Sequence, residues 1–253
     1  MLTDAWIVAV KEWREVLFRG MGLKGSIGFF GLILIVFGVA IPARAGYDWV
    51  MVPFMPLVFS WLPLMLVMAV VADSFAGERE RHTLETLLAS RLSDSAILFG
   101  KVGAAVAFAY GMLLLVSVMS ILSVNVAVPR PDPFLKPLVW GGPATFGVVV
   151  LGLLLTVLSA TIGVMVSLRS ETVRQANLRL STGLILFFPA LGFTLSGLWS
   201  VLPGALQVSL IDAVRTWEAW PVLAVVALSL AAIDAALLWI ASRMFVRDKL
   251  ILD

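Results

Sequence analysis

Long apolar runs alternate with short charged segments along this chain of 253 residues. Crossing a hydrocarbon core about 30 Å thick takes about 20 mostly apolar residues in an α-helix. Six runs meet this requirement, at residues 26–43, 52–72, 101–128, 145–168, 180–202 and 221–241. The pattern therefore predicts an all-α polytopic membrane protein, with six transmembrane helices in a single transmembrane domain over residues 1–253.

Composition agrees with this class. Hydrophobic residues make up 61% of the chain and charged residues 13%, whereas soluble domains are about 25% charged. The chain has no cysteine and a single histidine, His82. Disulfides and thiolate metal sites are therefore excluded, and we predict no metal site.

Basic residues predict the orientation of the spans, because Lys and Arg are retained on the cytoplasmic side of a membrane. With six spans and the N-terminus inside, all but four of the 18 basic residues fall on the cytoplasmic side. The exceptions are Arg44, Arg130, Lys136 and Arg215. We therefore expect a multi-pass protein of the inner (cytoplasmic) membrane with both termini in the cytoplasm, including a tail over residues 242–253.

The first 24 residues predict an amphipathic helix lying on the inner leaflet. One face of this helix carries Trp6, Ala9, Val10, Trp13 and Leu17, and the charged residues Lys11, Glu12, Arg14 and Glu15 point away from it. Charges also interrupt the apolar residues, so the segment does not resemble a signal peptide. The alternative is an amphipathic helix packed on the protein's own surface.

A charged block over residues 75–92 separates the second and third spans and predicts a second amphipathic helix. Its apolar residues Leu84, Leu87, Leu88 and Leu92 follow helical spacing. Glu78, Arg79, His82 and Thr86 point away from this stripe, Glu85 flanks it, and Glu80 and Arg81 interrupt its N-terminal end. A charged helix between two spans lies at the membrane surface, where a soluble partner can meet the membrane domain.

Small residues four positions apart allow close helix contact in a membrane. Two such rows occur, Gly103–Ala107–Gly111 in the third span and Gly152–Thr156–Ala160–Val164 in the fourth. Both predict tight packing, either within one subunit or between two.

The fifth and sixth spans carry two further features. Pro189, a candidate translocation or gating residue, is expected to break the fifth span, which ends at Pro203-Gly204. Residues 203–220 then form an external segment, either re-entrant or a surface helix. Asp234 stands inside the sixth span, where a carboxylate needs a partner or water. It is either a gate or polar contact for cargo, or a structural residue paired with a basic or hydroxyl neighbour.

Motifs for catalysis are missing. The sequence has no G-x-x-x-x-G-K-[ST] phosphate loop, no G-x-S-x-G and no H-E-x-x-H. We therefore expect a transport subunit rather than an enzyme, with no cofactor in this chain and no nucleic-acid partner.

The charged block and the residues after it resemble the signature of type-2 ATP-binding-cassette (ABC) exporter permeases, F-x-x-E-R-E-x-G-T-L-E-x-L-L-x-x-P followed by a G-K pair. The matching residues are Phe75, Glu78, Arg79, Glu80, Thr83, Leu84, Glu85, Leu87, Leu88, Ile97, Gly100 and Lys101. Lys11, Glu12 and Arg14 are similar to the K-E-x-R of the family's N-terminal helix. His82 replaces the usual glycine and Arg91 the usual proline, so we expect a helix that continues through both positions.

The resemblance implies a permease subunit that forms the translocation path of an ATP-driven exporter. It implies two copies of a separate ABC ATPase subunit, which bind ATP and Mg, and a second permease copy in a homodimer. The charged block would be the coupling helix, with its ATPase-docking residues Glu78, Arg79, Glu80, Arg81, Thr83, Leu84, Glu85, Leu87 and Leu88. Two alternatives remain, a secondary transporter or channel that uses Asp234, and a membrane assembly subunit that transports nothing.

Overall fold

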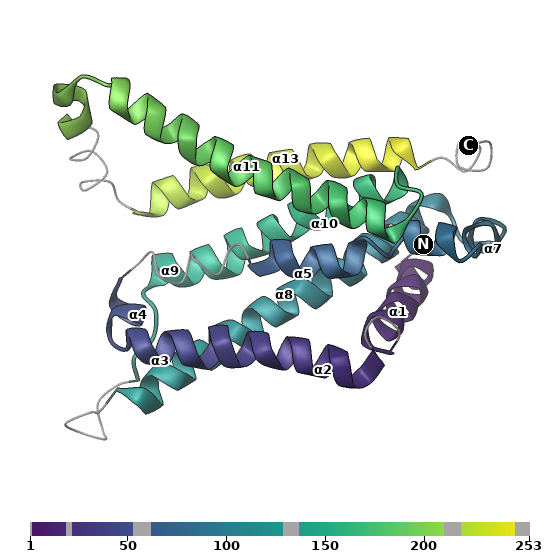
Figure 1. Cartoon of the computed structure of the whole chain (residues 1–253), viewed down its shortest axis with the longest axis horizontal. Helices are drawn as coiled ribbons and strands as arrows, with labels where there is room; N and C mark the ends of the chain where they lie inside the picture. The colour runs from purple at the N-terminus through teal and green to yellow at the C-terminus, as the bar shows by residue number, and fades with distance from the viewer. Residues whose placement is uncertain (1, 19–21, 53–61, 129–136, 210–218, 246–253) are drawn as a thin grey trace.

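The computed structural model of the chain describes residues 2–18, 22–52, 62–128, 137–209 and 219–245 (Figure 1). These parts are helical, with no strand among them. The elements are α1 Leu2–Phe18, α2 Gly22–Ile33, η1 Leu34–Ala40, α3 Ile41–Ala45, α4 Asp48–Met51, α5 Leu62–Val71, α6 Ala76–Glu80, α7 Leu84–Leu88, α8 Asp94–Ala127, α9 Gly142–Phe146, η3 Gly147–Leu151, α10 Gly152–Leu168, α11 Val173–Val201 and α13 Ala219–Met244.

Four helical stretches within the described residues are long and apolar enough to cross a membrane. They are Gly28–Ala45, Asp94–Ala127, Gly142–Leu168 and Trp220–Met244, and they correspond to the first, third, fourth and sixth predicted spans. The predicted second span falls partly outside the described residues, and α5 covers its last part. The predicted fifth span lies within α11.

Pro189 does not break α11, which runs without interruption through that residue. Proline removes one intrahelical hydrogen bond, and the helix continues on both sides of it. The helix ends at Val201, where the Gln207 side chain donates to the carbonyls of Trp199 (2.8 Å) and Leu202 (3.1 Å). The predicted turn at Pro203 is thus present. Most of the remaining external segment, residues 210–218, lies outside the described residues.

The long helix α8 organises the bundle. α1, η1, α5 and α10 all pack against it, and α13 packs against the outer side of α10 (Figure 1). Two π-helical segments, η1 and η3, interrupt the first and fourth spans. Such segments leave carbonyl groups without regular intrahelical partners. The Tyr110 hydroxyl from α8 donates to one of them, the Val149 carbonyl oxygen, at 2.9 Å.

The two rows of small residues have different environments. Gly152, Thr156, Ala160 and Val164 are buried, and a Cβ on Gly152 would lie 2.6 Å from Leu113 Cδ2 on α8. Gly103, Ala107 and Gly111 are exposed instead, with open space beside both glycines. The fourth-span row therefore packs inside this chain, as predicted, and the third-span row does not.

α1 turns a different face inward from the one its pattern suggests. Val8 and Glu12 are buried against α8, while Trp6 is 71% and Trp13 45% exposed. The indole N–H of Trp13 donates to the Ala104 carbonyl at 3.2 Å. The exposed tryptophans suit the predicted position on the inner leaflet, together with the exposed Arg14. Glu12 points away from the tryptophan face, as predicted, but it is buried against α8 and not exposed to water.

The segments with the most charge gather at one end of the bundle. α1, α6 and α7 lie there with the last turn of α13, and α3, α4 and α9 lie at the opposite end (Figure 1). The rings of Phe75 and Phe245 pack at this end with their centroids 5.4 Å apart. The N-terminal helix, the charged block and the end of the last helix therefore share one side of the molecule.

Candidate functional site: the charged block and its ionic cluster

The charged block forms two short helices, α6 and α7, and not the single helix predicted over residues 75–92. The break lies at His82, whose φ of 57° is in the left-handed region. Its N–H donates to the Arg79 carbonyl at 3.1 Å, and the N–H of Thr83 donates to the Glu78 carbonyl at 2.9 Å. This pair of bonds is the Schellman motif, in which the left-handed position usually holds glycine. His82 therefore occupies a left-handed position that usually holds glycine, and the expectation of a continuous helix is wrong.

The other departure from the family pattern does not extend the helix either. α7 ends at Leu88 although Arg91 replaces the proline. The Ser90 hydroxyl donates to the Leu87 carbonyl at 2.7 Å, and Ser93 caps α8 by accepting from the Ala96 N–H at 3.3 Å. Serine followed by an acidic residue is a strong start signal for a helix, and here it stops α7 from merging with α8.

Replacing His82 by glycine is expected to raise the free energy of unfolding by about 1 kcal/mol. A residue with a Cβ loses about 1–2 kcal/mol in the left-handed conformation, and the greater freedom of glycine in the unfolded chain offsets part of this gain. Thermal unfolding in detergent, followed by the fluorescence of the nine tryptophans, measures the change. The control is Thr86→Gly in α7, an exposed helical position where glycine should cost about 0.5–1 kcal/mol. Equal destabilisation by His82→Gly and Thr86→Gly would contradict the left-handed conformation of His82.

A buried ionic cluster lies beneath α6. We define it as Lys11 and Glu12 from α1, Glu78 from α6 and Lys101 from α8. The Lys101 side chain is fully buried, and its Nζ lies 2.5 Å from Glu12 Oε1, 2.6 Å from the Ser74 carbonyl oxygen and 3.2 Å from Glu78 Oε1. The same ammonium group stands 4.8 Å from the centroid of the Phe75 ring. A buried lysine keeps its charge only with such partners, so these contacts fix α1, α6 and α8 to one another.

Glu78 is the shared member of the cluster. Its side chain is 3% exposed, and its Oε1 also accepts from Lys11 Nζ at 2.7 Å. Its second oxygen, Oε2, is buried without a hydrogen-bond partner in the described part of the chain. Two positive and two negative side chains thus balance, with Glu12, Glu78 and Lys101 buried and the Lys11 side chain 43% exposed. Burial raises the pKa of Glu12 above its ordinary value, and the neighbouring Lys101 opposes this effect.

Close approach of α1 to α8 depends on Gly100. A Cβ at this position would lie 2.7 Å from Val8 Cβ and 2.8 Å from the carbonyl oxygen of Ala5. Both contacts are too short for a carbon atom, so only glycine fits. The Gly100-Lys101 pair therefore has two physical roles, because the glycine admits α1 and the lysine holds it.

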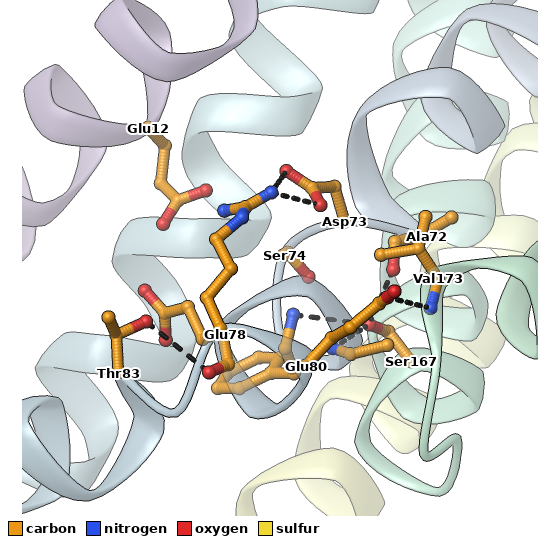
Figure 2. Close-up of polar contacts among 12 residues, drawn as sticks. Glu12, Ala72, Asp73, Ser74, Glu78, Glu80, Thr83, Ser167 and Val173 are labelled. Atoms are coloured by element: carbon orange, nitrogen blue, oxygen red, sulfur yellow. Dashed lines mark hydrogen bonds and ion pairs between the residues drawn. The ribbon is translucent and has the colours of Figure 1, made fainter. Parts of the chain in front are cut away.

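A second set of bonds joins the charged block to the loop between α10 and α11 (Figure 2). The Ser167 hydroxyl accepts from the N–H groups of Phe75 and Ala76, each at 3.1 Å, and donates to the Ala72 carbonyl at 3.2 Å. The Ser167 hydroxyl thereby accepts hydrogen bonds from N–H groups that have no intrahelical partner at the start of α6. Glu80 Oε2 accepts from the Val173 N–H at 3.1 Å.

Two arginines complete this junction. The Arg79 guanidinium donates to the Ser170 carbonyl at 2.9 Å. Arg81 forms an ion pair with Asp73, in which Nη2 donates to both carboxylate oxygens, at 2.5 Å to Oδ1 and 2.6 Å to Oδ2. The charged block is therefore bonded to α1, α8 and the α10–α11 loop at the same time.

The predicted docking residues divide into two groups. Glu78 is buried, Leu84 is 7% exposed within the protein's own core, and Leu87 packs against that core. The expectations that Glu78 faces a partner and that the leucine stripe fills a partner's groove are therefore wrong for these residues. The side chain of Leu88 lies outside the described residues.

Exposed residues of the block form what we call the docking surface, made of Arg81, His82, Thr83, Glu85 and Thr86. Glu80 is also exposed, although its carboxylate is bonded to Val173. The surface thus consists of the turn between the helices and the outer side of α7.

Sequence patterns did not reveal the cluster itself. Helical periodicity assigns every charged residue to the outer face, so Glu12 and Glu78 were both placed in water. One signal was present: Lys101 lies among apolar residues at the start of a span, and a lysine there needs an acidic partner. The partner, Glu12, is 89 residues away in sequence, and no local pattern connects the two.

Within the described residues, no group of three or more His, Asp or Glu side chains is arranged to hold a metal ion. Pro189 lies exposed in α11, far along the chain from the cluster, and Asp234 is buried in α13. The structure therefore does not bring these two predicted gating residues to the charged block.

Comparison with known proteins gives no relative for this chain: no protein-family model matches it, and no curated protein matches it at a significant level.

Proposed function

We propose that this chain is the permease subunit of an ATP-driven exporter of the type-2 ABC class. It has six spans with both termini in the cytoplasm, and it pairs with a second permease copy and with two copies of a separate ATPase. One observation carries the proposal. The docking surface is exposed at the same end of the bundle as α1 and the last turn of α13. The helix beside it, α6, is bonded to α1, α8 and the α10–α11 segment.

The bonds explain how a push on the docking surface could reach the spans. α6 meets α8 through Lys101, α1 through Lys11, and the facing ends of α10 and α11 through the Ser167 hydroxyl and the Val173 N–H. Coupling between distant sites needs such a contiguous network of packed and bonded groups. An ATPase that moves the turn at His82 would therefore move α1, α8 and the α10–α11 loop together.

The two groups of predicted docking residues then differ in role. Glu85 is exposed on α7 and is a docking residue, whose charge can fix the register of the ATPase on the helix. Glu78 is buried and is a positioning residue, which acts through Lys11 and Lys101.

Reversing the charge of Glu85 should separate docking from folding. The chain is co-expressed with its proposed ABC ATPase partner, and the complex is purified in nanodiscs. Glu85→Lys is expected to reduce ATPase co-purification about tenfold, since a charge-assisted contact at an interface contributes about 1.5–3 kcal/mol. Thermal unfolding of the chain should stay unchanged.

The control variant is Asp48→Lys, an exposed acidic residue at the opposite end of the bundle. It should leave both ATPase co-purification and stability as in the native chain. A native level of ATPase binding and ATP-driven export by the Glu85→Lys protein would contradict the docking assignment. Export that needs no ATPase at all would favour the alternative, a secondary transporter that uses Asp234.

A further inference from the structure

Asp234 is a buried acidic residue that the coupling scheme does not use. It lies on α13 with 4% of its surface exposed, and neither carboxyl oxygen has a hydrogen-bond partner among the described residues. It stands ten residues before Met244, the end of α13, so it is about 15 Å along the helix from that end. The carboxyl group is therefore near the middle of a membrane span.

α10 and α13 run side by side in the same direction, which fixes what lies at the depth of Asp234 (Figure 1). At one end the rings of Phe146 and Trp220 pack with centroids 5.6 Å apart. At the other end Arg169 lies 3.9 Å from the sulfur of Met244. Ser159 is ten residues before Arg169, so it has the same depth as Asp234. Thr156 is one turn further along.

The hydroxyl groups at this depth can only accept hydrogen bonds. Thr156 Oγ1 donates its proton to the Gly152 carbonyl at 2.6 Å, and Ser159 Oγ donates to the Leu155 carbonyl at 2.5 Å. Their remaining capacity is that of an acceptor, as is that of an ionised carboxylate. The polar side chains at this level of α10 and α13 therefore offer acceptors to a ligand and no donors.

The described elements that pack most closely on α13 also carry no positive charge. The elements that pack most closely on α13 are α10, η3 and α9, and none of them contains Asp, Glu, Lys, Arg or His. On α13 itself the only basic residue is Arg243, nine positions away, whose guanidinium lies over the Trp239 ring at 5.2 Å. An ionised carboxylate with no partner is strongly disfavoured in such a site. Burial without a partner therefore favours the protonated form of Asp234.

We propose that Asp234 binds the primary ammonium group of an amphipathic amine, in exchange for its proton. An ammonium group supplies N–H donors and a positive charge, which match a carboxylate that has no hydrogen-bond partner among the described residues. The reaction is Asp234–COOH plus R–NH₃⁺ giving Asp234–COO⁻ paired with R–NH₃⁺, with one proton released to water. The inference rests on the proposed export function only in treating the amine as cargo.

The exchange can be followed by infrared difference spectroscopy on the purified chain in nanodiscs, without any ATPase. Adding octylammonium should remove the carbonyl stretching band of a protonated carboxylic acid and produce carboxylate bands. Because one proton leaves for each amine bound, the apparent affinity should rise about tenfold per pH unit while the empty site is protonated. Octanol has no charge and octyltrimethylammonium has no N–H donor, so neither should change the acid band.

Variants assign the signal to this site. Asp234→Asn should abolish the difference bands, and Asp234→Glu should keep them at a shifted frequency. The proposal is overturned if Asp234→Asn gives the native difference spectrum, or if octylammonium leaves the acid band of the native chain unchanged. Neither result would affect the assignment of the docking surface, which is measured by ATPase binding.

Discussion

Replacing Lys101 by methionine is expected to lower the free energy of unfolding by about 3–5 kcal/mol, the usual cost of leaving a buried charge without its partner. Methionine fills a similar volume, so the loss is electrostatic and not one of packing. Glu12 would lose its bond of 2.5 Å, and Glu78 would keep only Lys11. Thermal unfolding in detergent, followed by tryptophan fluorescence, measures the effect.

Neutralising the acidic partners supplies the control. The triple variant Lys101→Met, Glu12→Gln, Glu78→Gln should recover most of the lost stability, because it leaves no unpaired charge in the site. Glu12→Gln in the native background should be destabilising, since it leaves Lys101 with a weaker partner. Lys101→Met with native stability, or a triple variant less stable than Lys101→Met, would show that the cluster is not what holds α1 to α8.

The pH dependence of the Lys101→Met protein gives an independent readout. Burial raises the pKa of Glu12, and the positive charge of Lys101 is the largest effect that lowers it. Removing the lysine leaves burial as the dominant cause, so the pKa of Glu12 in the folded variant lies further above its unfolded value. A raised folded pKa gives stability that is present at low pH and is lost as pH rises through it. Acidification should therefore reduce the difference in the free energy of unfolding between the Lys101→Met protein and the native chain.

Four of the six spans that hydropathy predicts correspond to helices long and apolar enough to cross a membrane, and the reason is physical. A long apolar run such as residues 102–124 of α8 can satisfy its backbone in lipid only as a helix, so its identity does not depend on its neighbours. The same argument placed the charged block outside the membrane. What it could not give was the shape of the block, because helix propensity at His82 competes with a turn that is stabilised by bonds to Glu78 and Arg79.

The ionic cluster escaped prediction for a related reason. Amphipathic patterns sort residues by polarity, and they place a charged residue on the outside unless a partner is known. Glu12 and Lys101 belong inside because each neutralises the other, which is a property of the pair. The resemblance to a family motif marked Gly100 and Lys101 as a unit, but their roles became clear only when α1 was placed against α8.

Gly100→Ala tests the other half of that unit and should lower the free energy of unfolding by about 1–3 kcal/mol, as overpacking of a close contact does. The added methyl group would lie 2.7 Å from Val8 Cβ and 2.8 Å from the Ala5 carbonyl oxygen. Neither atom can move away by a side-chain rotation, because one is a Cβ atom and the other belongs to the backbone. The same substitution at Gly103, three residues along α8, meets nothing within 4 Å.

Gly103→Ala should therefore stabilise the helix by up to about 1 kcal/mol, the advantage of alanine over glycine in a helix interior. The two substitutions share their chemistry and their helix, so opposite signs can arise only from the contact with α1. Because α1 holds Lys11 and Glu12, its displacement should also weaken ATPase binding by the Gly100→Ala chain and leave that of the Gly103→Ala chain unchanged. Equal effects of the two substitutions on stability would contradict the close packing of α1 on α8, and with it the path from the docking surface to the third span.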